Sequence, residues 1–311
     1  MSLIVTGTIG IDTVHTPSGS AEDIPGGSCA YFAAAASCYT PTRVVAAVGD
    51  DWPEDHKTLL ESFPGLDLAG LEIRGGSKTF RWGGKYLENM NDRETLFTDI
   101  GVLGEAPPEI PASFQDSEVV FLANTHPAVQ RGFLDHLPAR KFTVADTMDL
   151  WINTAREDLV SLLGAIDGLV INDSEALLLT EERNPFAAAR VIMDMGPRVV
   201  VIKKGEHGAV LVSGDDVAVL PAFPADETQV VDPTGCGDSF AGGFMGWIAS
   251  RGSWAFPDLQ AAMAWGTISA SFTLGAFALE GLRGLSMDHL EQRMACFQAA
   301  ARVGDPSAVR S

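Results

Sequence analysis

Val230-Val-Asp-Pro-Thr-Gly-Cys-Gly-Asp-Ser-Phe-Ala-Gly-Gly-Phe-Met-Gly246 joins the end of an apolar strand to a glycine-rich turn and then to a helix. The helix is predicted to begin around Asp238. Glycines at a helix start let backbone N–H groups converge, and the helix dipole adds positive potential there. The stretch therefore predicts an anion hole for a phosphoryl group, with Asp238 beside it as a candidate general base. The residues alone leave a second interpretation equally open, in which Asp238 only caps the helix.

Outward from this stretch, short apolar runs alternate with helical patterns. Strands are predicted at Leu3–Gly7, Val44–Val48, Val119–Leu122, Phe142–Ala145, Gly168–Ile171 and Val199–Ile202. Helices are predicted at Ser28–Cys38, Pro127–Leu137, Trp151–Ile166, Pro185–Met195, Phe240–Ser250, Leu259–Leu274 and Met287–Arg302. Nearly continuous apolar strands are typical of a parallel sheet covered on both faces, and the β-then-α alternation predicts a doubly wound α/β fold.

Residues 66–99 interrupt this rhythm, because their predicted strands alternate polar and apolar residues and are separated by turn signals at 75–76 and 88–93. Such alternation indicates a sheet with one face in water. We expect a small β lid at 66–99, with a contribution from 10–25, on a body made of 1–65 and 100–311. The alternative is a solvated antiparallel extension without a role in the site.

Composition limits the classes of partner. Of 311 residues 46% are hydrophobic, which excludes a disordered chain, and 41 acidic against 21 basic residues give a net charge of −20. This balance argues against nucleic acid or an anionic membrane as a partner. Four scattered cysteines give neither a zinc site nor a disulfide framework. Without a signal peptide or a membrane-length apolar run, we expect a cytoplasmic protein that acts on a small molecule.

The string from 230 to 246 closely resembles the C-terminal signature of the PfkB (ribokinase-like) family of carbohydrate and nucleoside kinases, Asp-Thr-x-Gly-Ala-Gly-Asp-x-Phe. The matching residues are Asp232, Thr234, Gly235, Gly237, Asp238 and Phe240. The resemblance implies a three-layer α/β/α sandwich with a mainly parallel sheet and a small β-sheet lid. It also implies that Asp238 is the catalytic base, that Gly235, Cys236 and Gly237 form the anion hole, and that Thr234 contacts the nucleotide.

Further segments extend the resemblance to the nucleotide side. Asn172-Asp-Ser-Glu175 is similar to the family's Asn-x-x-Glu motif, which implies that Asn172 binds nucleotide and that Glu175 holds Mg²⁺ through water. The same two residues also satisfy the pattern of a helix capping box. The segment 201–209 implies nucleotide binding by Lys203, Gly205 and Gly208; Lys203 is equally well explained as a solvated lysine. The segment 264–276, which includes Gly275, resembles the lining of the adenine pocket. The implied cofactors are ATP and Mg²⁺, with a monovalent cation as an optional third.

On the acceptor side, the resemblance assigns substrate-binding roles to Asp12 and to the glycine pair Gly26 and Gly27. Tyr31 stands where sugar kinases of this family usually have asparagine. The segment 145–151 keeps Asp146 of the family's Asp-x-Asn-x-Arg but has Met148 and Leu150 for the last two. These changes remove hydrogen-bonding groups, so we expect an atypical acceptor pocket.

Replacement contacts are sought in Tyr31 itself, in Asn124 and His126, and on the lid. Arg81 is a candidate acceptor-binding residue, together with Lys85 and Tyr86, and an inward-facing cation there suits an acceptor that already carries phosphate or carboxylate. For both cations the alternative is a solvated strand face, and His126 is also explained by a strand-to-helix turn.

The leading hypothesis is an ATP-dependent kinase that phosphorylates a hydroxyl of a sugar or sugar-like molecule. The alternative is a nucleoside kinase in which Tyr31 or Phe32 packs against a base, and the third hypothesis is a catalytically silent sensor. The chain lacks both the Gly-x-Gly-x-x-Gly fingerprint after its first strand and a Walker-type Gly-x-x-x-x-Gly-Lys motif. A homodimer through the lid is a further expectation.

Overall fold

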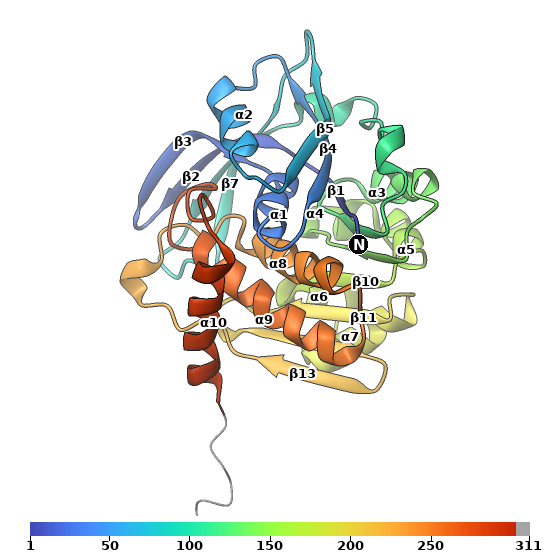
Figure 1. The fold of residues 1–311 in the computed structure, drawn as a ribbon, viewed down its shortest axis with the longest axis vertical. Coiled ribbons are helices and arrows are strands. Elements are labelled where there is room, and N and C mark those ends of the chain that lie inside the picture. The colour runs from blue at the N-terminus through green and yellow to red at the C-terminus, as the bar shows by residue number, and fades with distance from the viewer. Residues whose placement is uncertain (303–311) are drawn as a thin grey trace, which may run out of the picture.

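A nine-stranded sheet runs through the part of the computed structural model that is described, residues 1–302 (Figure 1). The order of its strands is β13-β12-β11-β10-β9-β8-β1-β4-β5, and seven of them are parallel. Two antiparallel strands, β12 and β13, close one edge. The strands are β1 (Leu3–Thr6), β4 (Thr42–Gly49), β5 (Leu66–Arg74), β8 (Val119–Leu122), β9 (Phe142–Ala145), β10 (Gly168–Asn172), β11 (Val199–Lys203), β12 (Ala209–Ser213) and β13 (Asp216–Leu220).

Helices cover both faces of this sheet, which confirms the predicted three-layer α/β/α fold. One apolar core joins the sheet to α1 (Ser28–Ala36), α2 (Glu54–Glu61), α8 (Cys236–Arg251) and α9 (Phe256–Thr273). The core on the other face includes α3 (Pro127–Phe133), α4 (Asp149–Thr154), α5 (Arg156–Leu163), α6 (Asp173–Thr180) and α7 (Pro185–Asp194). A last helix, α10 (Met287–Ala301), packs on α9. The central strands are buried on both faces, as their continuous apolar runs predict.

Four strands form a separate small sheet in the order β3-β2-β6-β7 within the described residues. They are β2 (Gly10–Thr16), β3 (Gly19–Gly26), β6 (Phe80–Tyr86) and β7 (Arg93–Asp99). The two middle strands, β2 and β6, pair in parallel, while both outer pairs are antiparallel. The small sheet is therefore built from two chain segments, 10–26 and 80–99.

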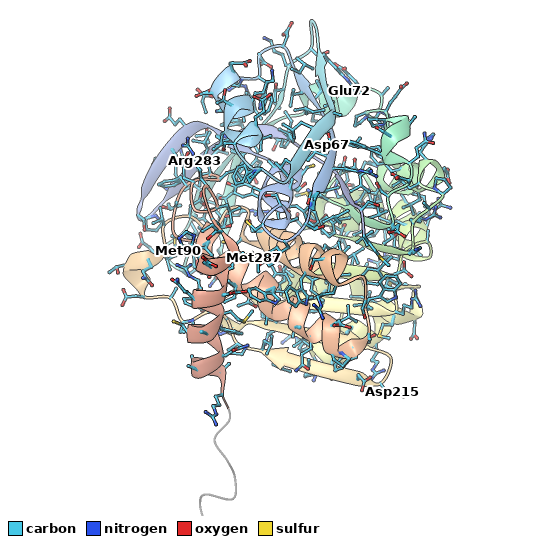
Figure 2. All side chains as sticks on the ribbon, viewed as in Figure 1. Asp67, Glu72, Met90, Asp215, Arg283 and Met287 are labelled. Carbon is cyan, nitrogen blue, oxygen red and sulfur yellow. The ribbon has the colours of Figure 1, made fainter. Side chains whose placement is uncertain are left out.

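The structure differs from the expected lid boundary at residue 66. Strand β5 lies in the large sheet, parallel to β4, with Leu66 opposite Thr42 and Arg74 opposite Gly49. Its alternating pattern arises because β5 is an edge strand with part of its surface in water. In Figure 2 its residues Asp67 and Glu72 lie at the opposite end of the molecule from Asp215, which lies in the turn at the other edge.

No helix within residues 1–302 combines the length and the apolar character needed to cross a bilayer.

Candidate active site

The carboxyl ends of four neighbouring parallel strands bring polar residues to one edge of the large sheet. Asn124 and Asp146 follow β8 and β9 closely, while Asn172 and Lys203 are the last residues of β10 and β11. The N-terminus of α8 brings Asp238 to the same edge, since Asp238 and Lys203 both affect the pKa of Asp146 and Lys203 lowers the pKa of Asp238. Ligands of doubly wound sheets bind at this kind of edge.

The turn that precedes α8 has the backbone shape of an anion hole. Gly235 takes a left-handed conformation, with φ of 74°, and the N–H group of Thr234 donates to Oδ1 of Asp232 over 2.8 Å. The N–H group of Cys236 donates to the carbonyl of Pro233, whereas within the described residues the N–H groups of Gly235 and Gly237 have no partner. These two amides are therefore the ones that the turn leaves for an anion.

The thiol of Cys236 contributes no charge to this turn. Its sulfur lies 3.6 Å from the carbonyl oxygen of Ala270, and burial raises the pKa of the thiol far above its usual value. The thiol stays protonated, so Cys236 contributes to the anion hole through its backbone and not through its side chain.

Asp238 lies half-buried in the first turn of α8. Burial raises the pKa of its carboxyl to about 6, while Lys203 and Arg93 lower that pKa and Glu175 raises it further. Lys203 reaches the same turn, because a Cβ built on Gly237 would lie 2.7 Å from its Nζ atom. A carboxylate with this pKa can accept a proton near neutral pH, beside cations that can hold a phosphate.

Asp146 adds a further carboxyl group at this edge. It is 6% exposed, and its Oδ1 atom is buried without a hydrogen-bond partner among the described residues. Burial raises the pKa of Asp146, and Asp238 raises it further. A buried carboxyl oxygen that lacks a partner has capacity for a ligand.

Asn172 and Glu175 form the capping box at the start of α6. The N–H group of Glu175 donates to Asn172 Oδ1 over 2.7 Å, and the N–H group of Asn172 donates to Glu175 Oε2 over 3.0 Å. Burial raises the pKa of Glu175, against the effect of Lys203. Within residues 1–302 there is no group of three His, Cys, Asp or Glu side chains placed to hold a metal ion.

The predicted glycines on the nucleotide side occupy turns. Gly205 and Gly208 lie between β11 and β12 with φ of 53° and 87°, and a Cβ on Gly208 would lie 2.0 Å from the carbonyl oxygen of Leu220. Gly275 follows α9 and faces the carbonyl oxygen of Gln229. At Gly205 and Gly208 the turn itself requires glycine, and nucleotide binding by these three glycines stays a prediction.

Asp12 and the glycine pair meet on the acceptor side. Asp12 is 4% exposed, and a Cβ on Gly26 would lie 1.9 Å from its Oδ2 atom. Gly27, with φ of 96°, has its Cα against the carbonyl oxygen of Thr8, where a Cβ would approach to 2.4 Å. Burial raises the pKa of Asp12 to about 7, with help from Asp232.

Tyr31 and Phe32 lie inside α1, all of whose residues are buried. Tyr31 is 1% exposed, and its ring packs directly under Gly235, where a Cβ would lie 2.3 Å from the ring. Phe32 stacks on Phe121, with ring centroids 4.2 Å apart. Neither aromatic ring offers a surface to a ligand, so the expected packing of a base on Tyr31 or Phe32 does not fit this structure.

The small sheet turns two arginines to opposite faces. Arg81 pairs with Ile11 and Asp99 in the ladder, and its guanidinium binds Asp23 at 2.7 Å, away from the α8 turn. Arg93 lies opposite Tyr86 and therefore shares its face. The structure does not bring Arg81 to the site, and Lys85, which alternates with Tyr86, is exposed.

Arg93 is the cation that the sequence analysis missed. Its guanidinium lies 5.5 Å from the centre of the Trp82 ring, and the neighbouring Tyr86 hydroxyl is 3.3 Å from Oγ1 of Thr234 in the anion turn. Arg93 is exposed to solvent, like the rest of β7; its partial desolvation would lower its pKa, but Tyr86 and Glu175 raise that pKa. Only the strand register reveals that Arg93 belongs to the face with Asp12, which pairs with Trp82.

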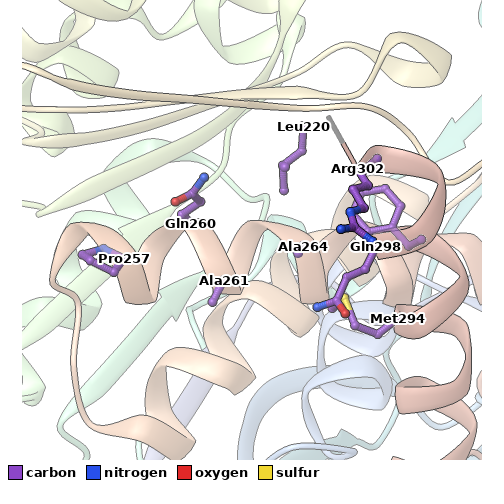
Figure 3. A pocket seen from close by; sticks show the side chains of 10 residues that line it. Leu220, Pro257, Gln260, Ala261, Ala264, Met294, Gln298 and Arg302 are labelled. Carbon is purple, nitrogen blue, oxygen red and sulfur yellow. The ribbon is translucent and has the colours of Figure 1, made fainter. Parts of the chain in front are cut away.

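A cavity of about 390 Å³ lies elsewhere, between α9, α10 and the end of β13 (Figure 3). Its walls include Leu220, Ala261, Ala264 and Met294 and contain none of the charged residues of the sheet edge. The lining is mostly apolar, with Gln260, Gln298 and Arg302 as its polar side chains, so the cavity is a separate feature from the candidate active site.

A doubly wound sheet, a small accessory sheet and a carboxylate beside an anion turn define a class of phosphotransferases that act on small molecules. Comparison with known proteins gives the family. Residues 114–278 match the pfkB family of carbohydrate kinases, so the chain belongs to that family. It is a kinase with an alcohol group as acceptor, and this membership implies ATP with Mg²⁺.

Three relatives illustrate the range of acceptors. The chain is 32% identical to a cytidine kinase of Thermococcus kodakarensis over 79% of its length and 87% of that protein. It is 29% identical to an ATP-dependent ribose-1-phosphate kinase of Halopiger xanaduensis, over 80% of each chain. An E. coli structure assigned to ribokinase II, solved with ATP and Mg²⁺, shares the fold with a TM-score of 0.75 and 17% identity, over 94% of this chain and 99% of that one.

Proposed function

We propose that this protein transfers the γ-phosphoryl group of ATP to a hydroxyl of a sugar or of a small molecule that contains a sugar. The observation that carries the proposal is the place of Asp238, in the first turn of α8 with a pKa near 6 and with Lys203 against the same turn. A base, two free amides and a cation at one point are what in-line phosphoryl transfer requires.

In the proposed reaction the acceptor hydroxyl gives its proton to Asp238 while its oxygen attacks the γ-phosphorus. The new oxygen–phosphorus bond forms as the bond to the leaving oxygen of ADP breaks. The amides of Gly235 and Gly237 and the ammonium of Lys203 stabilise the charge on the transferring group. Arg93 faces the same space from the small sheet, which we propose acts as a lid over the reaction.

Mg²⁺ fits the donor set, because hard cations prefer oxygen ligands and Mg²⁺ keeps several waters. Asp146 offers a buried oxygen without a partner, and Glu175 uses only Oε2 in the capping box. When bound, Mg²⁺ supplies charge neutralisation on the phosphates. We propose that Asp146 and Glu175 hold it, at least partly through water.

The predicted monovalent cation and lid-mediated dimer each have one supporting feature. Oδ2 of Asp232 is buried without a partner among the described residues, which leaves room for a cation beside it. Strand β7 is an edge strand that exposes Leu96 and Phe97. A higher turnover rate in K⁺ than in tetramethylammonium would support the cation. A solution mass of two chains for the wild type, and of one chain for Phe97→Asp, would support the dimer. The cytoplasmic location stays a prediction.

The decisive experiment measures ADP release from MgATP with sugars, sugar phosphates and nucleosides as acceptors. Asp238→Asn is expected to bind MgATP as the wild type does and to lose about 10³-fold or more in kcat. Asp216→Asn, on the exposed face of β13, is the matched control. Near-normal turnover by Asp238→Asn would remove this residue from the mechanism. Silence of the wild type with every acceptor, together with no stabilisation by MgATP, would favour the silent-sensor hypothesis.

A further inference from the structure

A half-buried aromatic wall stands at the acceptor side of the sheet edge, where neither Tyr31 nor Phe32 is available. We infer that the acceptor is a nucleoside, and that His126 and Trp151 form the surface that receives its base. This inference rests on the proposed kinase function and goes beyond it, because it names the substrate class and the residues that select it.

Four side chains hold the wall together. The indole N–H of Trp151 donates to Oδ1 of Asn124 over 3.0 Å, and Nδ2 of Asn124 lies 3.1 Å from Sδ of Met148. His126 packs edge-on against Trp151, with ring centroids 5.0 Å apart and an interplanar angle of 61°. Asn124 thus uses both ends of its amide to fix the indole, so the wall is preorganised.

The residues that support the wall lie next to the glycine pair and next to Asp146, which places the wall on the acceptor side. The carbonyl oxygen of Asn124 accepts a hydrogen bond from Ser28 Oγ over 3.3 Å, directly after the pair Gly26 and Gly27. Met148 is two residues beyond Asp146, whose carboxyl interacts with Asp238. The loops after β8 and β9 therefore carry the wall to the region between the glycine pair and the catalytic carboxylate.

The opposite side of this region is formed by the small sheet. Asp149, at the start of α4, is close enough to Arg93 to affect its ionisation, and Arg93 lies over Trp82. A flat ligand group that enters here meets aromatic rings on one side and the guanidinium of Arg93 on the other. Bases stack well on such surfaces, whereas a free sugar or sugar phosphate gains little from them.

His126 adds a directional contact. Its Nδ1 atom accepts the N–H group of Ala128 over 3.2 Å at the start of α3, so the neutral ring carries its proton on Nε2. Among residues 1–302, Nε2 has no hydrogen-bond partner. It is therefore a free donor beside an indole face, suited to a carbonyl oxygen or ring nitrogen of a base. A site built to donate to a base discriminates strongly against acceptors that lack one.

Two variants are designed to remove a contact with the base while leaving the folded structure in place. Trp151→Leu removes the ring, while His126→Asn removes the Nε2 donor and keeps a side-chain oxygen able to cap α3. Trp254→Leu and His136→Asn are matched controls outside the wall, since Trp254 stacks on Phe142 and His136 is exposed in the turn after α3. Cytidine, adenosine, inosine, ribose and ribose 1-phosphate are the probes.

The best nucleoside is expected to exceed ribose by at least about 100-fold in kcat/KM. Trp151→Leu should lower that value by roughly 10- to 100-fold and His126→Asn by about 10-fold, with little change for ribose or in the KM for MgATP. Preference of the wild type for ribose or ribose 1-phosphate, or an equal loss with every acceptor in Trp151→Leu, would overturn the nucleoside inference while the kinase function stands.

Direct binding gives a readout that does not need turnover. Titration of the wild type with each nucleoside, followed by calorimetry, should show binding that Trp151→Leu weakens by the same factor. If no acceptor is phosphorylated, the proposed kinase function fails, but nucleoside binding that depends on Trp151 would still support the wall. Absence of nucleoside binding to the wild type, with or without MgATP, would overturn it.

Discussion

The ring of Tyr31 lies directly beneath Gly235, so that a Cβ on Gly235 would approach its Cγ and Cδ1 atoms to 2.3 Å. Helix α1 thereby supports the anion turn of α8 from below. The Tyr31 hydroxyl is buried without a partner among the described residues, and burial and then Asp232 raise its pKa. The residue that replaces the family's asparagine therefore supports the turn, and its ring is covered by protein.

Gly235→Ala is expected to lower kcat by at least about 100-fold, because the methyl group must displace the Tyr31 ring and so move the amides of the turn. Gly284→Ala is the matched control: its φ of 70° is nearly that of Gly235, with open space around the Cβ position. Both variants carry the left-handed strain of about 1–2 kcal/mol. Equal kcat in the two variants would show that the contact with Tyr31 has no catalytic importance.

The two lid arginines give a second matched pair. Arg93→Met should lower kcat/KM by about 100-fold, since Arg93 lowers the pKa of Asp238 and, in the proposed reaction, faces the transferring group. Arg81→Met should change it by less than about 3-fold, because Arg81 binds Asp23 in an exposed pair on the other face. Steady-state kinetics with the best acceptor measure both effects. A larger loss in Arg81→Met than in Arg93→Met would refute the conclusion that Arg93, and not Arg81, lies on the face toward the site.

Activity should depend on the ionisation of Asp238. Only the carboxylate accepts a proton, so kcat/KM is expected to fall tenfold per pH unit below about pH 6. Lys203 favours the carboxylate, so Lys203→Met should raise the pKa of Asp238 and move this acid limb to higher pH. Lys204→Met, one residue further on, should leave the limb in place. A limb that does not move in Lys203→Met would contradict the proximity of the two groups.

Asp12 should make stability depend on pH. Its carboxyl has an ordinary pKa of 3.8, which folding raises to about 7, so the folded protein binds the proton more tightly than the unfolded chain. This contribution to stability is complete below about pH 4 and is lost as the pH rises through 7. Asp12→Asn cannot ionise and should gain as much as ~4 kcal/mol relative to the wild type between pH 4 and pH 8.

Chemical denaturation of both proteins at several pH values measures this difference, with Asp216→Asn as the exposed control. A constant difference between wild type and Asp12→Asn across this range would mean that Asp12 ionises normally in the folded protein.

The sequence predicts the central strands well, because burial on both faces leaves its mark in the residues of each strand itself. Val119–Leu122 and Phe142–Ala145 are nearly uninterrupted apolar runs, and both strands have the bounds that the sequence predicts. Strand β5 was misassigned because an edge strand shows the same polar alternation as a strand of a small solvated sheet. Which sheet a strand joins depends on its partner, and here the partner is β4.

The site residues also differ in whether local sequence or a distant partner determines their place. Motif spacing identifies Asp238 and the glycines of the anion turn, because these residues are neighbours in the sequence and act from one turn and the start of one helix. Helix α1 is buried all round, so its apolar pattern does not reveal that Tyr31 points to the anion turn. The face of Arg93 depends on a register shift opposite Gly83 and Gly84, which no local pattern encodes. His126 and Trp151 meet only because two loops converge.

The small sheet has a consequence for how this enzyme can be altered. Its strands come from segments 10–26 and 80–99, joined through the parallel pair β2 and β6. A single deletion or a single graft would split that pair and leave half a sheet on the body. Exchange of acceptor specificity between relatives by recombination therefore requires two crossovers for each segment, and the elements α1, β4, α2 and β5 between the segments must come through unchanged.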